Sequence, residues 1–451
     1  MAKYLKINPP KRGSKITVAK NGQLQVPDDP VIPFVQGDGI SAEVWRSSER
    51  VFEAAVEHCY GNAKRLEWME VHAGERGNEL YGAGNWLPED TIRAIQEYKV
   101  CVKGPLSTPV GQPKSLDTTL REKLELFARV QPIRYLDGLP SPANSTKGLS
   151  LTIFREHAED VHSEIEWKKG SPEAKQLINF INNDLNKRSA ERAIRPDSSI
   201  GIKPISATAT KRVMRLAIEY AIKHRKRSVT FVHKGDVMRL TEGFFRDWGY
   251  ELAKKEFGDY IVTERPMEGE RINGNGNGNG NGNGEPPKGK VIVRDRLADT
   301  MFEEMLTRPY DYDVVVATNL NGDYLSSLAL TLVGDARISP MGYIGAKAAL
   351  FQSTLAMPLN GDAESDVCPG SVLLAGVMLF EHLGWKDAAE LVASSLGRTV
   401  ADGTVTRDLA RKMPGAKVLT TSQFCDRLID NFEEVRNARV REAMERTVIR
   451  A

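Results

Sequence analysis

The segment 228–257 constrains the fold more than any other part of the chain, because an apolar run, a charged loop and an amphipathic stretch follow one another in it. The residues 229–232 are mostly β-branched or aromatic, which predicts a buried strand. A helix is expected from Thr241 and Glu242 onward, with apolar residues on one side, namely Phe244, Phe245, Trp248 and Leu252. Between these elements lies Lys234, at the carboxyl end of the strand, where α/β sheets bind ligands.

Three further strand-to-loop edges indicate an α/β protein. The apolar residues 31–35 lead into a Gly-Asp-Gly turn and a predicted helix that ends near Ala55. A second apolar run, 100–102, precedes Lys103, and a third, 314–316, precedes the polar sequence 319–324. Polar residues therefore follow several predicted strands at the ends where a parallel sheet places its ligands.

Composition narrows the class of protein. A chain of 451 residues with 27% charged and 41% hydrophobic residues can bury a large core and is expected to hold two domains. The net charge of +2 gives no electrostatic reason to expect nucleic acid as a partner. Four scattered cysteines without metal-ligand spacing, and no apolar run of about 18 residues, predict a cytoplasmic protein with reduced thiols and no membrane span.

Two segments are expected to lie outside the packed core. Six Asn-Gly repeats at 273–284 cannot bury apolar surface, so we predict a flexible insertion over 266–289. The charged sequence from Asn431 predicts a solvated terminal helix.

Five short motifs give the chain a resemblance to a known family: FRE…ED at 154–160, GIKP at 201–204, VHKG at 232–235, NLNGDY at 319–324 and PGS at 369–371. With them the chain resembles isocitrate dehydrogenases of the isocitrate/isopropylmalate dehydrogenase family. The resemblance implies an α/β fold of two domains with a clasp segment that interlocks two subunits into a homodimer. The implied ranges are 1–126 and 334–451 for a large domain, 127–159 and 207–333 for a small domain, and 160–206 for the clasp.

The implied reaction is oxidation of a tricarboxylate with a 2-hydroxyl group, or of a related hydroxyacid, by NAD(P), followed by loss of a carboxylate. Such a substrate carries about three negative charges, so cationic side chains must surround it. Mg²⁺ or Mn²⁺ must polarise the developing carbonyl group, and an acid and a base must move protons.

The resemblance assigns these roles to residues of this chain. Carboxylate-binding positions match Ser115, Arg121 and Arg155, and Asp117 lies in the same substrate loop. Proton transfer is implied for Lys234, which reaches the site of the partner subunit, and for His162, which stands in place of a tyrosine. Asp299 and Asp323 match two of three metal-binding aspartates, and Arg407 and Arg411 are the candidates for contacts with NADP.

The departures from the family pattern concentrate at the site. Asp117 replaces an asparagine, Gln131 replaces a carboxylate-binding arginine, and Ser327 replaces the third metal-binding aspartate. Arg129 lies two residues before Gln131, so strand alternation predicts that both side chains point the same way. In the nucleotide loop the expected polar residues are absent, and Leu355, Ala356, Met357, Asn360 and Cys368 stand in that region.

Two functions therefore stay open on the sequence. The first is an isocitrate dehydrogenase-type enzyme that is weakly active or acts on a related hydroxyacid, in which Arg407 and Arg411 would favour NADP over NAD. The second is a dimeric pseudoenzyme that has lost nucleotide binding and serves a binding or regulatory role.

Overall fold

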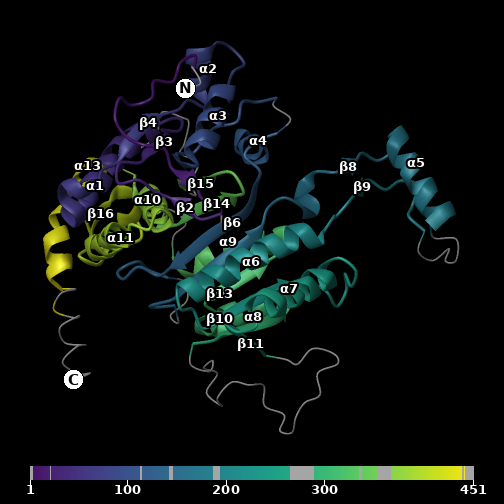
Figure 1. Ribbon diagram of the computed structural model, residues 1–451. Coiled ribbons are helices and arrows are strands. Elements are labelled where there is room, and N and C mark those ends of the chain that lie inside the picture. The colour runs from purple at the N-terminus through teal and green to yellow at the C-terminus, as the bar shows by residue number, and fades with distance from the viewer. Residues whose placement is uncertain are drawn as a thin grey trace, which may run out of the picture. The chain divides into compact units, whose positions relative to one another are not determined.

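The computed structural model describes residues 4–20, 22–111, 114–141, 146–185, 193–264, 289–334, 338–353, 367–438 and 441 (Figure 1). The chain forms two compact units, each built from separate stretches of sequence. The first unit holds 1–153, 302–313 and 325–451, and the second holds 154–301 and 314–324. Residues 127–153, 302–313 and 325–333, which we expected in the smaller domain, are part of the first unit.

The second unit contains a parallel sheet with the strand order β11-β12-β10-β13. Its strands are β10 (Ser228–His233), β11 (Ile261–Thr263), β12 (Val291–Leu297) and β13 (Val314–Ala317). The predicted strand 229–232 is thus confirmed as the interior strand β10, and all six of its residues are buried. Since β12 and β13 both run parallel to β10, the loops after the three strands leave the sheet at one edge.

Two long helices of the second unit pack against each other, α6 (Ala207–Lys223) and α7 (Glu242–Phe257), and α7 also packs on β10. A side chain at Gly249 would meet Phe231 at 2.9 Å, so glycine allows α7 to approach the sheet this closely. The predicted apolar side of α7 is split. Phe245 is buried, whereas Phe244 is 40% exposed and stacks on Trp248.

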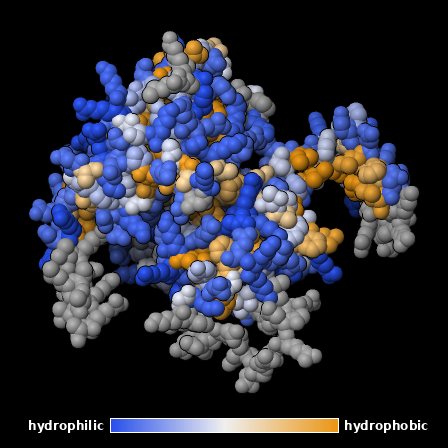
Figure 2. Space-filling view, in the orientation of Figure 1, coloured by the Kyte–Doolittle hydropathy of each residue, from blue (hydrophilic) through white to orange (hydrophobic). Residues whose placement is uncertain are grey.

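A projecting arm of the second unit comprises residues 164–185 and 193–203 among those described (Figure 1). It consists of an antiparallel pair, β8 (Glu166–Trp167) and β9 (Ile200–Gly201), and the helix α5 (Pro172–Phe180), which Ser171 caps. Figure 2 shows exposed apolar surface on the arm. The exposed apolar residues there include Ile165, Phe180 and Leu185. The arm falls within the segment 160–206, for which the sequence predicted a clasp.

The first unit contains a mixed sheet with the strand order β6-β14-β15-β5-β3-β4. The strands are β3 (Val31–Val35), β4 (Glu67–Glu70), β5 (Val100–Lys103), β6 (Leu126–Arg134), β14 (Pro340–Gly345) and β15 (Ala349–Ser353). The strand β7 (Ser150–Glu156) carries the chain from the first unit into the second. Aromatic rings fill the core beside β3, where Phe34 stacks on Trp45 with ring centroids 4.5 Å apart.

Helices flank this sheet, and two further helices straddle the boundaries between the units. The helices of the first unit are α1 (Ser41–Tyr60), α2 (Glu75–Tyr81), α3 (Glu89–Tyr98), α4 (Leu116–Lys123), α10 (Gly370–Leu383), α11 (Lys386–Ala401), α12 (Arg407–Ala410) and α13 (Thr421–Asp430). The straddling helices are α8 (Ala298–Thr307) and α9 (Asn319–Leu332). Within the described ranges, none of the helices has the length and apolar character that crossing a membrane requires.

Candidate active site

A lysine and two aspartates form the first polar cluster of the second unit. Lys234 directly follows β10, and its ammonium group donates to Asp236 and to Asp299, each at 2.9 Å. The hydrogen bonds that Lys234 donates to Asp299 and Asp236 raise the pKa of the lysine, and the same contacts lower the pKa of both carboxyl groups. The structure thus brings together two residues that the sequence assigned to proton transfer and metal binding, Lys234 and Asp299.

An arginine, a histidine and an aspartate form the second cluster. Arg155 is buried, and its guanidinium donates to Asn319 at 2.7 Å, contacts Asp323, and lies 3.1 Å from the His162 ring. His162 is also within 4.0 Å of Asp323. A side chain at Gly322 would meet Arg155 at 2.9 Å, which explains the glycine of the NLNGDY motif. Three residues predicted for substrate, proton and metal contacts therefore lie together.

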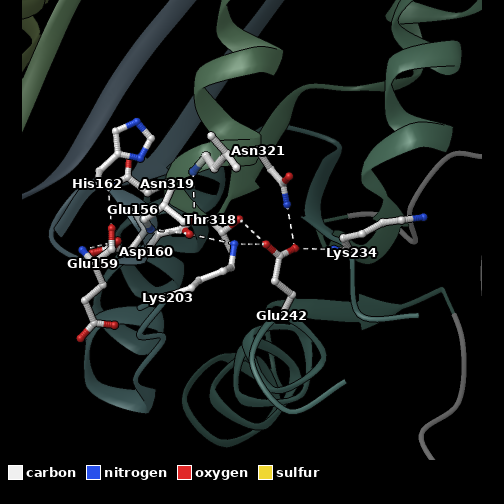
Figure 3. Close-up of polar contacts among 12 residues, drawn as sticks. Glu156, Glu159, Asp160, His162, Lys203, Lys234, Glu242, Thr318, Asn319 and Asn321 are labelled. Carbon is white, nitrogen blue, oxygen red and sulfur yellow. Dashed lines mark hydrogen bonds and ion pairs between the residues drawn. The ribbon is translucent and has the colours of Figure 1, made fainter. Parts of the chain in front are cut away.

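A buried carboxylate, that of Glu242, connects the loops that carry these two clusters (Figure 3). One of its oxygens accepts from Lys203 at 2.7 Å and from Thr318 at 3.3 Å. Its other oxygen accepts from the Lys234 main chain at 2.5 Å and from Asn321 at 2.7 Å. Glu242 is fully buried, and four donors, one of them the Lys203 ammonium, replace water around its carboxylate.

Asp160 extends this network toward the second cluster. Its carboxylate lies 2.8 Å from the Lys203 ammonium and accepts from the main-chain N–H groups of Val161 and Leu320, at 2.7 and 2.8 Å. The backbone of Asp160 is left-handed, with φ of 72°. Leu320 lies in the first turn of α9, where a carboxylate is favoured by the helix dipole.

The buried ionic network of Asp160, Lys203 and Glu242 was not predicted from the sequence. Two of its members lie in the quoted motifs, Asp160 in FRE…ED and Lys203 in GIKP. The motifs thus contained the signal, but only the fold shows that they meet at the start of α7.

Glu156, next to Arg155, is a second buried carboxyl group. It accepts from the main-chain N–H groups of Ala158 and Glu159, at 2.8 and 3.0 Å. Burial raises the pKa of Glu156 to about 7, although both hydrogen bonds act in the opposite direction.

The substrate loop predicted around Ser115 lies in the first unit. The Ser115 hydroxyl caps α4 by accepting from the Thr118 main chain at 3.0 Å. Arg121 projects from the same helix, donates to the Thr118 hydroxyl at 3.1 Å, and lies 5.1 Å over the ring of Tyr343. A serine hydroxyl and a guanidinium are thus carried by one short helix.

Asp117, which replaces an asparagine, has a cationic partner. Its carboxylate lies 2.8 Å from the ammonium of Lys103, a residue at the end of β5. The side chain of Lys103 is fully buried. The charge that this substitution adds to the substrate loop is therefore balanced within the first unit.

Gln131 is buried in β6 and contacts the neighbouring arginine. Its amide oxygen accepts from Arg129 at 3.0 Å, and its amide nitrogen donates to Ser339 at 3.3 Å. Arg129 and Gln131 share one face of the strand, as strand alternation predicts.

The candidate NADP contacts lie at α12 of the first unit. Arg407 begins this helix and Arg411 directly follows it. The adjacent Asp408 accepts from the Cys368 main chain at 3.2 Å, which places the PGS motif beside α12. Leu355, Ala356, Met357 and Asn360 lie outside the described residues, and the nucleotide-binding roles of Arg407 and Arg411 stay predictions.

The two candidate metal ligands have the chemistry that a hard divalent cation prefers, but their described contacts lie in different clusters, Asp299 beside Lys234 and Asp323 beside Arg155. Asp299 and Asp323 offer carboxylate oxygens, the ligands that Mg²⁺ and Mn²⁺ prefer, and their side chains are 66% and 43% exposed. Ser327 follows Asp323 by one helical turn of α9. Within the described ranges, no three His, Cys, Asp or Glu side chains lie together in a way that could hold a metal.

The parallel strands β12, β10 and β13, whose following segments carry Asp299, Lys234 and Asp323, define the second unit as part of an α/β protein with polar side chains gathered at one sheet edge. The chain belongs to the isocitrate/isopropylmalate dehydrogenase family, whose model matches residues 31–428. The resemblance seen in the sequence is thereby confirmed, and with it the class of oxidoreductase.

Named relatives cover nearly the whole chain. Isocitrate dehydrogenase (NADP) of Archaeoglobus fulgidus is 44% identical over 96% of this chain and 100% of its own length. The protein of the same name from Haloferax volcanii is 41% identical over 96% of this chain and 99% of its own. Among solved structures, isocitrate dehydrogenase from Methylococcus capsulatus is similar, with a TM-score of 0.67, 27% identity, and coverage of 89% of this chain and 99% of that one.

Proposed function

We propose that this protein oxidises and decarboxylates isocitrate, or a related 2-hydroxyacid, with NADP and a divalent metal ion. The observation that carries the proposal is the pair of clusters in the second unit, Lys234 between two aspartates and Arg155 beside Asp323 and His162. The names of the relatives at 41–44% identity support the same reaction.

Each group has a chemical task in this proposal. Arg155, Arg121 and Ser115 bind substrate carboxylates, and each charge-assisted hydrogen bond contributes about 1.5–3 kcal/mol. His162 and Lys234 move protons, and Arg407 and Arg411 bind phosphate groups of NADP. Asp299 and Asp323 would hold Mg²⁺ or Mn²⁺, which when bound supplies the Lewis acid that polarises the substrate carbonyl.

A steady-state assay of NADP reduction with isocitrate and Mn²⁺ tests the proposal. We expect isocitrate-dependent turnover that needs millimolar NADP and is near background at the lower concentrations of a standard assay. Leu355, Ala356 and Met357 lack polar side chains, and each lost hydrogen bond costs about 0.5–1.5 kcal/mol. Three or four such losses weaken binding by roughly two to four orders of magnitude if they add. A micromolar Michaelis constant for NADP would show that the loop binds nucleotide by other contacts.

A homodimer is expected, because exposed apolar side chains on the arm need a partner surface. Ile165, Phe180 and Leu185 are 39%, 49% and 65% exposed. We expect the arm to interlock with that of a second copy, with Lys234 completing the partner's site. Light scattering at micromolar concentration should give the mass of two chains. A stable folded monomer there would contradict both the clasp and the shared site.

The substitution Ser327→Asp should strengthen metal binding. It restores a third carboxylate one turn after Asp323, and the affinity of oxygen sites for divalent cations rises with ligand charge. We expect the dissociation constant for Mn²⁺, measured by calorimetry, to fall by roughly tenfold. Ser327→Asn is the matched control, because it adds similar bulk without charge. Equal affinities in the two variants would show that this turn of α9 does not face the metal.

A second candidate function is a dimeric pseudoenzyme that binds a tricarboxylate without turnover. It is favoured by one arrangement: a candidate metal ligand, Asp323, is bound by the candidate substrate residue Arg155, and the third aspartate position is a serine. A thermal-shift panel separates the candidates. Stabilisation by tricarboxylates alone, unchanged by Mn²⁺ or millimolar NADP, together with no turnover, would establish the pseudoenzyme.

A further inference from the structure

The main chain that carries Lys234 is fixed from two sides by buried acceptors. The N–H group of Lys234 donates to Glu242 at 2.5 Å, and the N–H group of Gly235 donates to Nδ1 of His233 at 3.0 Å. The other ring nitrogen of His233 lies 3.3 Å from Asp295. The backbone is thus held at two consecutive residues, Lys234 and Gly235, and the lysine side chain extends from this held segment.

Glu242 also holds groups from other parts of the second unit. The oxygen that accepts from Lys234 accepts from Asn321, two residues before Asp323. The opposite oxygen accepts from Lys203 and Thr318. Figure 3 shows His162 and Lys234 at opposite ends of this network, pointing away from each other, with Glu242 between the two loops.

We propose that Glu242 is a positioning residue for Lys234, whose main chain it ties to the first turn of α9. This inference rests on the proposed role of Lys234 in proton transfer. Glu242 touches neither the ammonium group of Lys234 nor the candidate metal ligands in any described contact. Glu242 accepts from the main-chain N–H group of Lys234 and so fixes the backbone of that residue. The lysine side chain then extends from this fixed backbone to Asp236 and Asp299.

The donors around Glu242 make the effect of an isosteric substitution predictable. Each of its two oxygens faces two donors, so the amide of Glu242→Gln cannot accept on both sides. We expect the amide oxygen to turn toward Lys203, whose positive charge makes the stronger hydrogen bond, and the NH₂ group to face the Lys234 N–H. In the double variant Glu242→Gln/Lys203→Met that cation is absent, so the amide oxygen of the glutamine can turn back to Lys234 and Asn321.

Hydrogen exchange measured by mass spectrometry tests the inference on the full chain. In Glu242→Gln we expect the amide of Lys234 to exchange about tenfold faster or more, because it loses its acceptor. In Glu242→Gln/Lys203→Met protection should return toward the wild-type value. Thr318→Val is the matched control, because it removes one donor from the opposite oxygen, and it should leave the Lys234 amide unchanged. A peptide from β5 in the first unit reports on global stability.

Turnover provides a second readout. We expect kcat for isocitrate to fall in Glu242→Gln by about tenfold or more and to recover in the double variant. KM for isocitrate should change less than about twofold.

Two results would overturn the inference. One is unchanged hydrogen exchange at the Lys234 amide in Glu242→Gln, and the other is a loss of protection there that the double variant does not restore. If Glu242→Gln does not fold, a double variant less protected at Lys234 than wild type overturns it, and equal protection supports it. Since exchange needs no turnover, an inactive wild type would refute the proposed function and leave this test intact.

Discussion

Substitution of Lys234 by methionine is expected to lower kcat for isocitrate by roughly 10²–10⁴-fold, the usual contribution of a positioned acid or base. The ammonium group of Lys234 donates only to Asp236 and Asp299 in the described structure, so no buried hydrogen bond is lost. KM for isocitrate and the unfolding temperature should therefore change little. Steady-state kinetics with saturating NADP and Mn²⁺ measures the effect.

Lys255→Met is the matched control for this prediction. Lys255 lies in the last turn of α7, also in the second unit, and is exposed, so its loss should leave kcat unchanged. A Lys234→Met enzyme within about threefold of wild type would exclude proton transfer by this lysine, and the proposed mechanism would need another acid or base.

Substitution of Arg155 by methionine is expected to raise KM for isocitrate by roughly 10- to 100-fold. A guanidinium that binds a carboxylate contributes about 1.5–3 kcal/mol, and each 1.4 kcal/mol is a factor of ten. Methionine keeps an unbranched stem against Gly322, which reduces the loss of packing. The initial rate as a function of isocitrate concentration provides the measurement.

The control for Arg155 is Arg215→Met. Arg215 makes a two-bond ion pair with Glu256 on the surface of the second unit, at 2.6 and 2.7 Å. Such exposed pairs contribute about 0–1 kcal/mol to stability and none to substrate binding. If the two variants had equal KM values, Arg155 would be confined to its contacts with Asn319 and Asp323.

Much of the fold follows from the sequence, because strands buried on both faces have continuous apolar runs. The runs at 31–35, 229–232 and 314–316 are the strands β3, β10 and β13, with ends shifted by at most one residue. The helix from Glu242 was also predicted, but Phe244 and Trp248 were expected on its buried side. They stack on each other at a partly exposed position, since only the packing of α6 and β10 decides which side of α7 faces inward.

The candidate site could be predicted only in part. Lys234 beside Asp299, and Arg155 beside Asp323 and His162, came from motifs whose roles the resemblance supplied. The charge pairings could not be predicted, because they join different elements of the fold: Asp117 of α4 with Lys103 of β5, and Glu242 of α7 with Lys203 of the GIKP motif. By sequence alone Asp117 adds a negative charge to the substrate loop, whereas in the fold the buried ammonium of Lys103 on β5 balances it.

The division of the chain also fixes an order of events during synthesis. The second unit is not complete until residues 314–324 have been made, since β13 pairs with β10 and the first turn of α9 supplies Asn321 to Glu242. The first unit is completed later, because it also contains residues 325–451. A ribosome-bound fragment that ends before residue 314 is therefore expected to leave one edge of β10 unpaired, and its aggregation should stop once β13 emerges.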